Sequence, residues 1–266
     1  MEAKSHPASS QRIARARALA GRYPAAAEIL TFYAQLAAYQ RTLLDQAPGP
    51  AIDREQLVAA IPSFLAWLER EAPATLAASA TDLRRLTSAD WRDRFDRACA
   101  EAPEQSGTDD DIAMFVVEAL LQPVAERNAA TNPRTDEPRA QSREPRAERR
   151  CPACGGLPLV GVLREEGHGA RRALVCARCA TEWPFERVCC PGCGERQFET
   201  LPVYTAEPFG HIRVEACDLC RRYLKTVDLT KDGLAVAQVD DLASLPLDLW
   251  ARGEGYVRVR ANLLRT

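Results

Sequence analysis

Apolar residues recur at helical spacing through the first half of the chain. In residues 24–46, and again after Asp53, Ser88 and Asp109, they lie three or four positions apart and so share one face of a helix. Residues 9–127 are also rich in Ala, Leu, Arg, Glu and Gln, which favour helices. The pattern predicts an all-α bundle of about four to six helices over residues 1–127. The apolar positions are Leu30, Tyr33, Ala34, Ala37, Leu44, Leu57, Ile61, Phe64, Leu65, Leu68, Trp91, Phe95, Cys99, Ile112, Phe115, Val116, Ala119 and Leu120.

Several residues mark where these helices should begin, end or bend. Residues 48–50, Pro-Gly-Pro, should end one helix, and Asp53 with Gln56 three residues later has the pattern of a capping box. Pro62 predicts a kink or a break in the helix that follows. Asp109–Asp111 supply the negative charge that favours the start of a helix. Three helix boundaries and one bend or break are therefore predicted from local chemistry alone.

The helix expected to start at the cap Ser88 carries the one cysteine of the first half of the chain. Cys99 continues an apolar face that begins with Trp91 and Phe95. A cysteine on such a face usually behaves as a small buried apolar residue. We therefore expect Cys99 to be packed and unreactive.

The pattern changes after residue 127. Residues 128–150 combine prolines, mixed charges and few bulky apolar side chains, which predicts a solvated linker with an Arg-rich end. Beyond it, short apolar runs predict strands in two small β modules, residues 151–188 and 189–230. A capped short helix and a tail follow in residues 231–266. The runs are residues 160–163, 173–176, 197–204, 212–216 and 221–228, and the short helix covers 240–250.

Composition and charge exclude several classes of protein. The 266 residues are 46% hydrophobic and 27% charged, with a formal net charge of −2, so no overall basic field attracts nucleic acid or acidic lipid. No apolar run is long enough to cross a membrane. The polar residues Met1–His6 lack the apolar segment of a secretory signal. The expected protein is soluble and cytosolic.

Nine of the ten cysteines lie between residues 151 and 220. Eight of them form four Cys-x-x-Cys pairs, with 21 residues between the first two pairs and 23 between the last two. Because a two-residue insert allows a tight turn to aim two thiolates at one ion, two such pairs complete a tetrahedral site. The sequence therefore predicts an internal duplication with two four-cysteine metal sites. The predicted ligands are Cys151, Cys154, Cys176 and Cys179 in the first site, and Cys190, Cys193, Cys217 and Cys220 in the second.

The glycines Gly155 and Gly194 follow two of the pairs and suit a turn that needs positive φ. A thioredoxin-type dithiol is the competing interpretation, but that motif usually occurs as one pair within a βαβ unit. Four thiolates suit zinc or a single iron, and spacing does not separate the two. Eight thiolates and two divalent ions would make residues 151–228 acidic, which disfavours a zinc ribbon that binds nucleic acid.

Other candidate residues carry weaker signals. Cys189 stands beside Cys190 as a spare thiol, either packed or reactive. His168, in a Gly-His-Gly hairpin tip, and His211 could act as substitute ligands, although surface positions are favoured because the thiolates already fill both sites. Trp183 and the pair Asp240–Asp241 are candidate partner contacts, but packing around the metal is the favoured interpretation for Trp183 and helix capping for the aspartates. No nucleophile–base pair, phosphate loop or carboxylate dyad indicates a hydrolase or transferase.

The cysteine-rich half resembles the formate dehydrogenase accessory protein family, FdhE. The resemblance is carried by Cys-Pro-x-Cys-Gly at 151–155, by the three later pairs, and by segments 179–183 and 214–225. Asp-Asp-Leu-Ala-Ser-Leu at 240–245, Glu-Gly-Tyr at 254–256 and Ala-Leu-Leu-Gln-Pro at 119–123 extend it, although it is looser before residue 100. The Arg/Pro linker and Cys189 depart from the family pattern without touching a predicted ligand.

The resemblance implies a function that the spacing alone does not. Members of this family are cytosolic accessory proteins that contact the catalytic subunit of respiratory formate dehydrogenase before its export by the twin-arginine route. They are associated with rubredoxin-like iron, so the resemblance favours iron over zinc. It implies a chaperone-like maturation factor and not an enzyme, with the helical domain and the groove beside the cysteine turns binding the client. A rubredoxin-like electron carrier remains the alternative.

Overall fold

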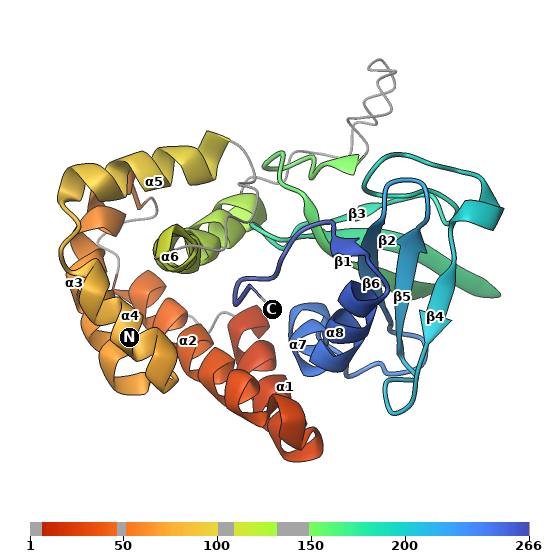
Figure 1. Ribbon diagram of the computed structural model, residues 1–266, viewed down its shortest axis with the longest axis horizontal. Helices are drawn as coiled ribbons and strands as arrows, with labels where there is room; N and C mark the ends of the chain where they lie inside the picture. The colour runs from red at the N-terminus through yellow and green to blue at the C-terminus, as the bar shows by residue number, and fades with distance from the viewer. Residues whose placement is uncertain (1–6, 47–51, 101–108, 132–148, 266) are drawn as a thin grey trace.

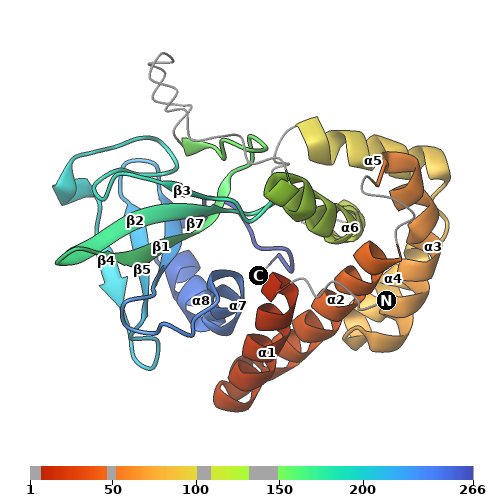
Figure 2. The same ribbon diagram turned by 180° about the vertical axis from the view of Figure 1, so that it is seen from behind.

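In the computed structural model, helices and a β-sheet form two halves that lie side by side (Figures 1 and 2). The structure describes residues 7–46, 52–100, 109–131 and 149–265. The expected Pro-Gly-Pro helix end at 48–50 and most of the expected linker lie outside these residues. This arrangement of a helical N-terminal region followed by a sheet region with two four-cysteine clusters confirms the predicted fold class.

The helical half follows the predicted apolar faces closely. The capping box forms at the start of α3, where the Asp53 side chain accepts from the Gln56 N–H and the Gln56 side chain accepts from the Asp53 N–H. The aromatic residues of this half cluster around Phe64 and Phe115 in one core. The elements are α1 (Pro7–Arg22), a 3₁₀ turn (Pro24–Ala26), α2 (Ala27–Asp45), α3 (Arg54–Glu71), α4 (Ala74–Leu83), α5 (Ser88–Ala100) and α6 (Asp109–Thr131).

Three local expectations need correction. Of the kink or break predicted at Pro62, the break does not occur: α3 continues through the exposed Pro62, and Ile61 and Leu65 on either side of it are buried. Cys99 is exposed, because the buried face of α5 passes through Trp91, Phe95 and Ala98, and Cys99 lies just beyond its border, about 100° around the helix from Ala98. The helix α6 runs to Thr131, four residues into the segment expected to be linker.

The two cysteine modules share a single sheet. Its strand order is β3-β2-β1-β6-β5-β4, with β7 beside β6. Each module contributes three consecutive strands in the same order, and the modules meet where β1 and β6 pair in parallel. The duplication read from the cysteine spacing is therefore also a duplication of strands. The strands are β1 (Pro158–Glu166), β2 (Gly169–Cys176), β3 (Glu182–Pro184), β4 (Val203–Thr205), β5 (Ile212–Cys217), β6 (Arg222–Asp228) and β7 (Val257–Arg258).

A glycine permits the junction between the modules. Gly161 on β1 lies opposite Thr226 on β6, and a Cβ atom at Gly161 would stand 2.3 Å from the Thr226 hydroxyl oxygen. That distance is far below van der Waals contact, so a larger residue would push the modules apart. The close approach of β1 and β6 thus depends on the absence of a side chain at position 161.

Two short helices cover one face of the sheet and connect it to the helical half. α7 (Ala237–Ala243) packs on β1 and β6, and α1 and α2 pack on α7. The helix α8 (Leu245–Gly253) follows directly. One apolar core therefore contains residues of α1 and α2 together with residues of β5, β6, α7 and α8. After β7 the chain returns to α6, where Arg260 and Arg265 both pair with Glu118.

Charged groups are buried at the centre of this packing. Lys225 on β6 is 0% exposed, and its Nζ donates to Asp248 Oδ2 at 2.5 Å and to the Asp241 carbonyl at 2.6 Å. Arg258 pairs with the Asp241 carboxylate, and Tyr223 donates to Asp248 Oδ1 at 2.7 Å. Burial alone would raise the pKa of Asp241, but Arg258 and Lys225 hold that pKa below its ordinary value. Asp241 therefore contributes stability above its ordinary pKa of 3.8, and this contribution is lost as the pH falls through the lower folded value.

Replacement of Lys225 by Met should destabilise the chain strongly. The change removes the cation and leaves the Asp241 and Asp248 carboxylates buried together, a situation that costs about 3–5 kcal/mol. The free energy of unfolding, measured by urea denaturation at pH 7, reports the loss. Lys231→Met is the matched control, because Lys231 is exposed and its Nζ contacts only the Gly210 carbonyl. Equal stabilities for the two variants would contradict the role of the buried network.

Candidate metal centres

All four Cys-x-x-Cys turns have the same backbone form. In each, the residue after the second cysteine donates its N–H to the carbonyl of the first cysteine, at 2.8–3.2 Å. That residue also has positive φ in every turn: Gly155 at 72°, Ala180 at 55°, Gly194 at 89° and Arg221 at 56°. The glycines Gly155 and Gly194 thus occupy the conformation expected for them. Ala180 and Arg221 adopt it without being glycine, so composition gave no signal at those two positions.

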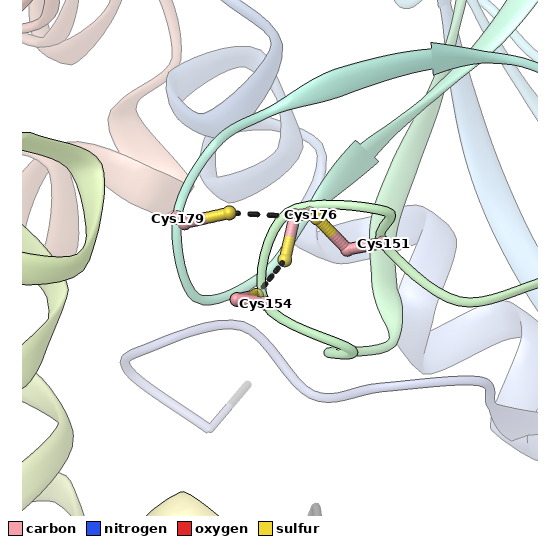
Figure 3. Close-up of side chains that lie close together, drawn as sticks. All are labelled: Cys151, Cys154, Cys176 and Cys179. Atoms are coloured by element: carbon pink, nitrogen blue, oxygen red, sulfur yellow. Dashed lines mark hydrogen bonds between the residues drawn. The ribbon is translucent and has the colours of Figure 1, made fainter. Parts of the chain in front are cut away.

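The first cluster comprises Cys151, Cys154, Cys176 and Cys179 (Figure 3). Cys151 and Cys154 precede β1, while Cys176 ends β2 and Cys179 lies between β2 and β3. The Sγ atoms of Cys151 and Cys179 are 3.5 Å apart, and those of Cys154 and Cys176 are 3.4 Å apart. A Cβ atom at Gly156 would stand 3.0 Å from the Cys176 sulfur, so the turn needs glycine there, which the sequence analysis missed.

The second cluster repeats this arrangement with Cys190, Cys193, Cys217 and Cys220. The first pair precedes β4 and the second pair joins β5 to β6. Sγ–Sγ distances are 3.7 Å for Cys190–Cys220 and 3.7 Å for Cys193–Cys217. The N–H of Gly192 donates to the Cys190 sulfur at 3.3 Å, as a backbone that supports a thiolate would.

The donor set and its spacing suit one tetrahedral metal ion in each cluster. Within each cluster the four sulfurs lie within 4.8 Å of one another. Tetrahedral metal–sulfur bonds of about 2.3 Å require sulfurs about 3.8 Å apart, close to the distances found. Four sulfurs without hard oxygen ligands favour zinc or iron. Each cluster could therefore hold a metal ion.

The thiols of a cluster cannot all ionise unaided. Hydrogen bonds with Cys151 and the other two thiols hold the pKa of Cys179 far below its usual range, and the same contacts raise the pKa of Cys176. In the second cluster, burial raises the pKa of Cys217 to about 11. In the first cluster the pKa values of Cys151 and Cys179 are thus lowered, and those of Cys154 and Cys176 are raised. A cation between the sulfurs removes this conflict, so metal binding releases protons and strengthens as the pH rises.

The surroundings of the two clusters differ. The first is packed among apolar groups from several parts of the chain, including Trp183, Leu224 and Val259, with Ala125 and Ala129 of α6 beside it. Its second turn is tied to the helical half, because the Arg178 guanidinium donates to the Ala98 carbonyl of α5. The second cluster lies at the surface: Cys193 is exposed and Cys220 is half-buried. The first cluster is thus built into the contact between the two halves, and the second is open to solvent.

The other candidate residues lie apart from the sulfur clusters. Trp183 is buried against the first cluster, and Asp240 and Asp241 are 0% exposed. These side chains are engaged inside the fold, so the expectation of partner contacts does not fit their positions. Asp240 caps α7 through the Val236 N–H and accepts from Arg15 of α1 at 2.6 and 3.0 Å.

Among the described residues, His168, His211 and Cys189 also supply no ligand to the clusters. His168 is exposed at the β1–β2 turn, as expected. His211 is buried, contrary to the surface position that was favoured, and its Nε2 lies 2.9 Å from Asp240 Oδ1. His211, Asp232 and Asp240 converge closely enough for a metal, but the Arg15 guanidinium bridges both carboxylates at 2.6 Å and already supplies the positive charge. Cys189 is packed, and burial raises its pKa.

Fold and clusters together define a helical protein fused to a duplicated four-cysteine metal-binding sheet. Residues 150–187 match the family model described as "FdhE, central domain" and residues 188–265 match "FdhE, C-terminal domain". The chain is similar over its full length to the crystal structure of the FdhE protein from Pseudomonas aeruginosa, with a TM-score of 0.72, 26% identity and 98% of that chain covered. The cysteine-rich part of the chain, residues 150–265, thus matches the FdhE family.

Curated relatives match mainly through the cysteine-rich half. An FdhE homolog from Aquifex aeolicus is 33% identical over 162 residues, which are 60% of this chain and 54% of the relative. The homolog from Pseudomonas aeruginosa is 40% identical over 121 residues, 43% of this chain and 38% of the relative. The chain thus spans about half or less of the curated relatives it matches. In the described part of the chain, no helix has the length and apolar character needed to cross a membrane.

Serine substitutions should remove one metal ion at a time. Cys151→Ser should leave only the second site loaded and Cys190→Ser only the first, because three thiolates and a hydroxyl hold a soft metal weakly. Metal-to-protein ratios from inductively coupled plasma mass spectrometry should fall from about two to about one in each case. Cys189→Ser, one residue from a predicted ligand, should keep both ions. Unchanged ratios in the first two variants would refute the ligand assignment.

Proposed function

We propose that this chain is a cytosolic maturation factor for respiratory formate dehydrogenase. It binds the catalytic subunit before export by the twin-arginine route and helps to produce active enzyme. The observation that carries the proposal is the match to the FdhE family: both cysteine modules match FdhE domains, and the fold matches an FdhE crystal structure along the full chain. The matched curated relatives are covered only in part, so client and cellular location remain part of the proposal.

The structure is consistent with a binding protein held together by metal. In this proposal the predicted cysteines Cys151, Cys154, Cys176, Cys179, Cys190, Cys193, Cys217 and Cys220 hold two ions, with iron favoured by the family resemblance and zinc as the alternative. The cations Lys225 and Arg15 form ion pairs with the internal carboxylates of Asp248 and Asp240. The described residues thus provide two four-cysteine clusters that could each hold an ion, and a buried network of ion pairs that supports the fold, as the proposed binding role requires.

An electron-carrying role is the second candidate, and the exposure of Cys193 favours it. Iron held by four thiolates passes one electron at a time, and transfer to a partner needs a centre near the surface. The second cluster meets that requirement, whereas the first is covered by Trp183 and α6. Reversible bleaching of visible absorbance by a mild reductant, together with reoxidation by a protein partner, would favour this role.

Capture of the client tests the main proposal. Tagged protein is recovered anaerobically from formate-respiring source cells, and co-purified proteins are identified by mass spectrometry. We expect enrichment of a formate dehydrogenase catalytic subunit that still carries its twin-arginine signal. Cys151→Ser and Cys190→Ser should reduce this enrichment to background if the metal-loaded fold binds the client, and Cys189→Ser should retain it. A catalytic subunit that is present in the lysate but never enriched by the wild-type chain would contradict the proposal.

A further inference from the structure

The surface beside the second cluster combines exposed apolar side chains with unpaired arginines. Phe198 is 72% exposed and Leu219, inside the Cys217–Cys220 turn, is 65% exposed, with Val188 and Val203 also at the surface. A groove lies next to them, between the loop that carries Cys189 and the strands β5 and β6. We call it the arginine groove. Its charged lining residues are Arg172, Arg187, Arg213, Arg222 and Glu215.

The single carboxylate of the arginine groove is already occupied. Arg172 Nη2 binds Glu215 Oε2 at 2.5 Å and Arg213 Nη2 binds Glu215 Oε1 at 2.5 Å. Arg172 is also buried, and its Nη1 donates to the Glu186 carbonyl at 2.7 Å, so it fixes the floor of the groove and the loop above it. The Arg172–Glu215–Arg213 group therefore keeps an excess positive charge.

The rim of the groove adds two arginines that have no acidic partner. Arg187 and Arg222 are exposed and form no ion pair with any described residue. The acidic residues Glu186 and Asp218 nearby are paired with Arg196 and Arg221 instead. The four arginines of the groove carry more positive charge than Glu215 neutralises. A divalent ion bound by four thiolates would add about two negative charges, which is less than that excess. The groove therefore stays positive when the second cluster is loaded.

Val203 of the edge strand β4 lines the groove. β4 is the last strand in the order β3-β2-β1-β6-β5-β4, so among the described residues its outer edge has no neighbouring strand (Figure 1). Val203 and Thr205 of this strand are exposed. An open strand edge can add an extended segment of another protein by backbone hydrogen bonds. The open strand edge, the exposed apolar side chains and the arginines together favour a peptide as the ligand of this surface. Nucleic acid is less suited, because Phe198 alone gives little surface for base stacking.

We propose that the arginine groove and the edge of β4 bind an extended acidic segment of a partner protein. Carboxylates of that segment bind Arg187 and Arg222, and its apolar side chains contact Phe198 and Val203. The identification of the partner as the client rests on the proposed function above, but acidic-segment binding itself does not.

A peptide titration tests the proposal with the metal-loaded full-length chain. The probe is a fluorescein-labelled, acetylated and amidated ten-residue peptide that alternates Glu with Leu, and binding is followed by anisotropy. We expect saturable binding that weakens with salt, and about tenfold weaker binding by Arg187→Glu/Arg222→Glu, since charge-assisted contacts are lost. Arg17→Glu/Arg252→Glu changes the net charge equally at exposed positions on α1 and α8 and should bind as the wild type does. Metal content of every variant is measured alongside.

Three results would overturn the proposal: no binding of the Glu/Leu peptide, equal binding of a Lys/Leu peptide, or unchanged affinity in the Arg187/Arg222 variant with both metals retained. Preferential binding of an oligothymidylate of equal charge would also overturn it in favour of nucleic acid. Because the titration contains no client, its failure is distinguishable from failure of the client capture, which tests the proposed function separately.

Discussion

Four thiolates cannot share a volume a few ångströms across without a cation among them. The Cys-x-x-Cys turns place sulfurs of each cluster 3.4–3.7 Å apart. The pKa of Cys179 is lowered and that of Cys176 is raised, because neighbouring thiols cannot all carry a negative charge. In the proposed account a metal ion resolves this competition at two places. Since the sulfur-bearing turns lie at the ends of strands, an ion bound in each cluster would also fix how those strands leave the turn. The shape of the sheet is thereby coupled to metal occupancy.

The two clusters have the same ligands but different surroundings. The first is enclosed by the sheet, the C-terminal segment and α6, and its Arg178 reaches α5. Its loss would loosen the contact between the helical half and the sheet. The second lies at the outer end of the sheet, with an exposed Cys193 and the arginine groove beside it. A duplicated module has thus become one interior centre and one surface centre, and we assign holding the fold together to the first and contact with partners to the second.

Local sequence patterns predicted the helical faces, the capping box at Asp53 and the cysteine pairs, because spacing within a few residues sets each of them. They failed where partners come from distant segments. Asp240 accepts the Val236 N–H at the start of α7, as the capping prediction expects. The partner-contact prediction does not fit, because Arg15 and Lys225, remote in sequence, pair with Asp240 and Asp241 inside the fold. The parallel pairing of β1 with β6 likewise follows from tertiary packing, which only Gly161 reflects in the sequence. Cys99 is exposed although the apolar spacing favours burial, because it lies at the border of the buried face, about 100° around the helix from the buried Ala98.

The central claim is that eight cysteines bind two metal ions through sulfur alone, and X-ray absorption spectroscopy of the purified chain tests it most directly. The edge energy identifies the metal, and the extended fine structure gives its neighbours. The expected result is a shell of four sulfur atoms at about 2.3 Å with no nitrogen or oxygen ligand. A first shell with substantial nitrogen or oxygen character, or protein that lacks bound metal and carries disulfides in its place, would contradict the claim.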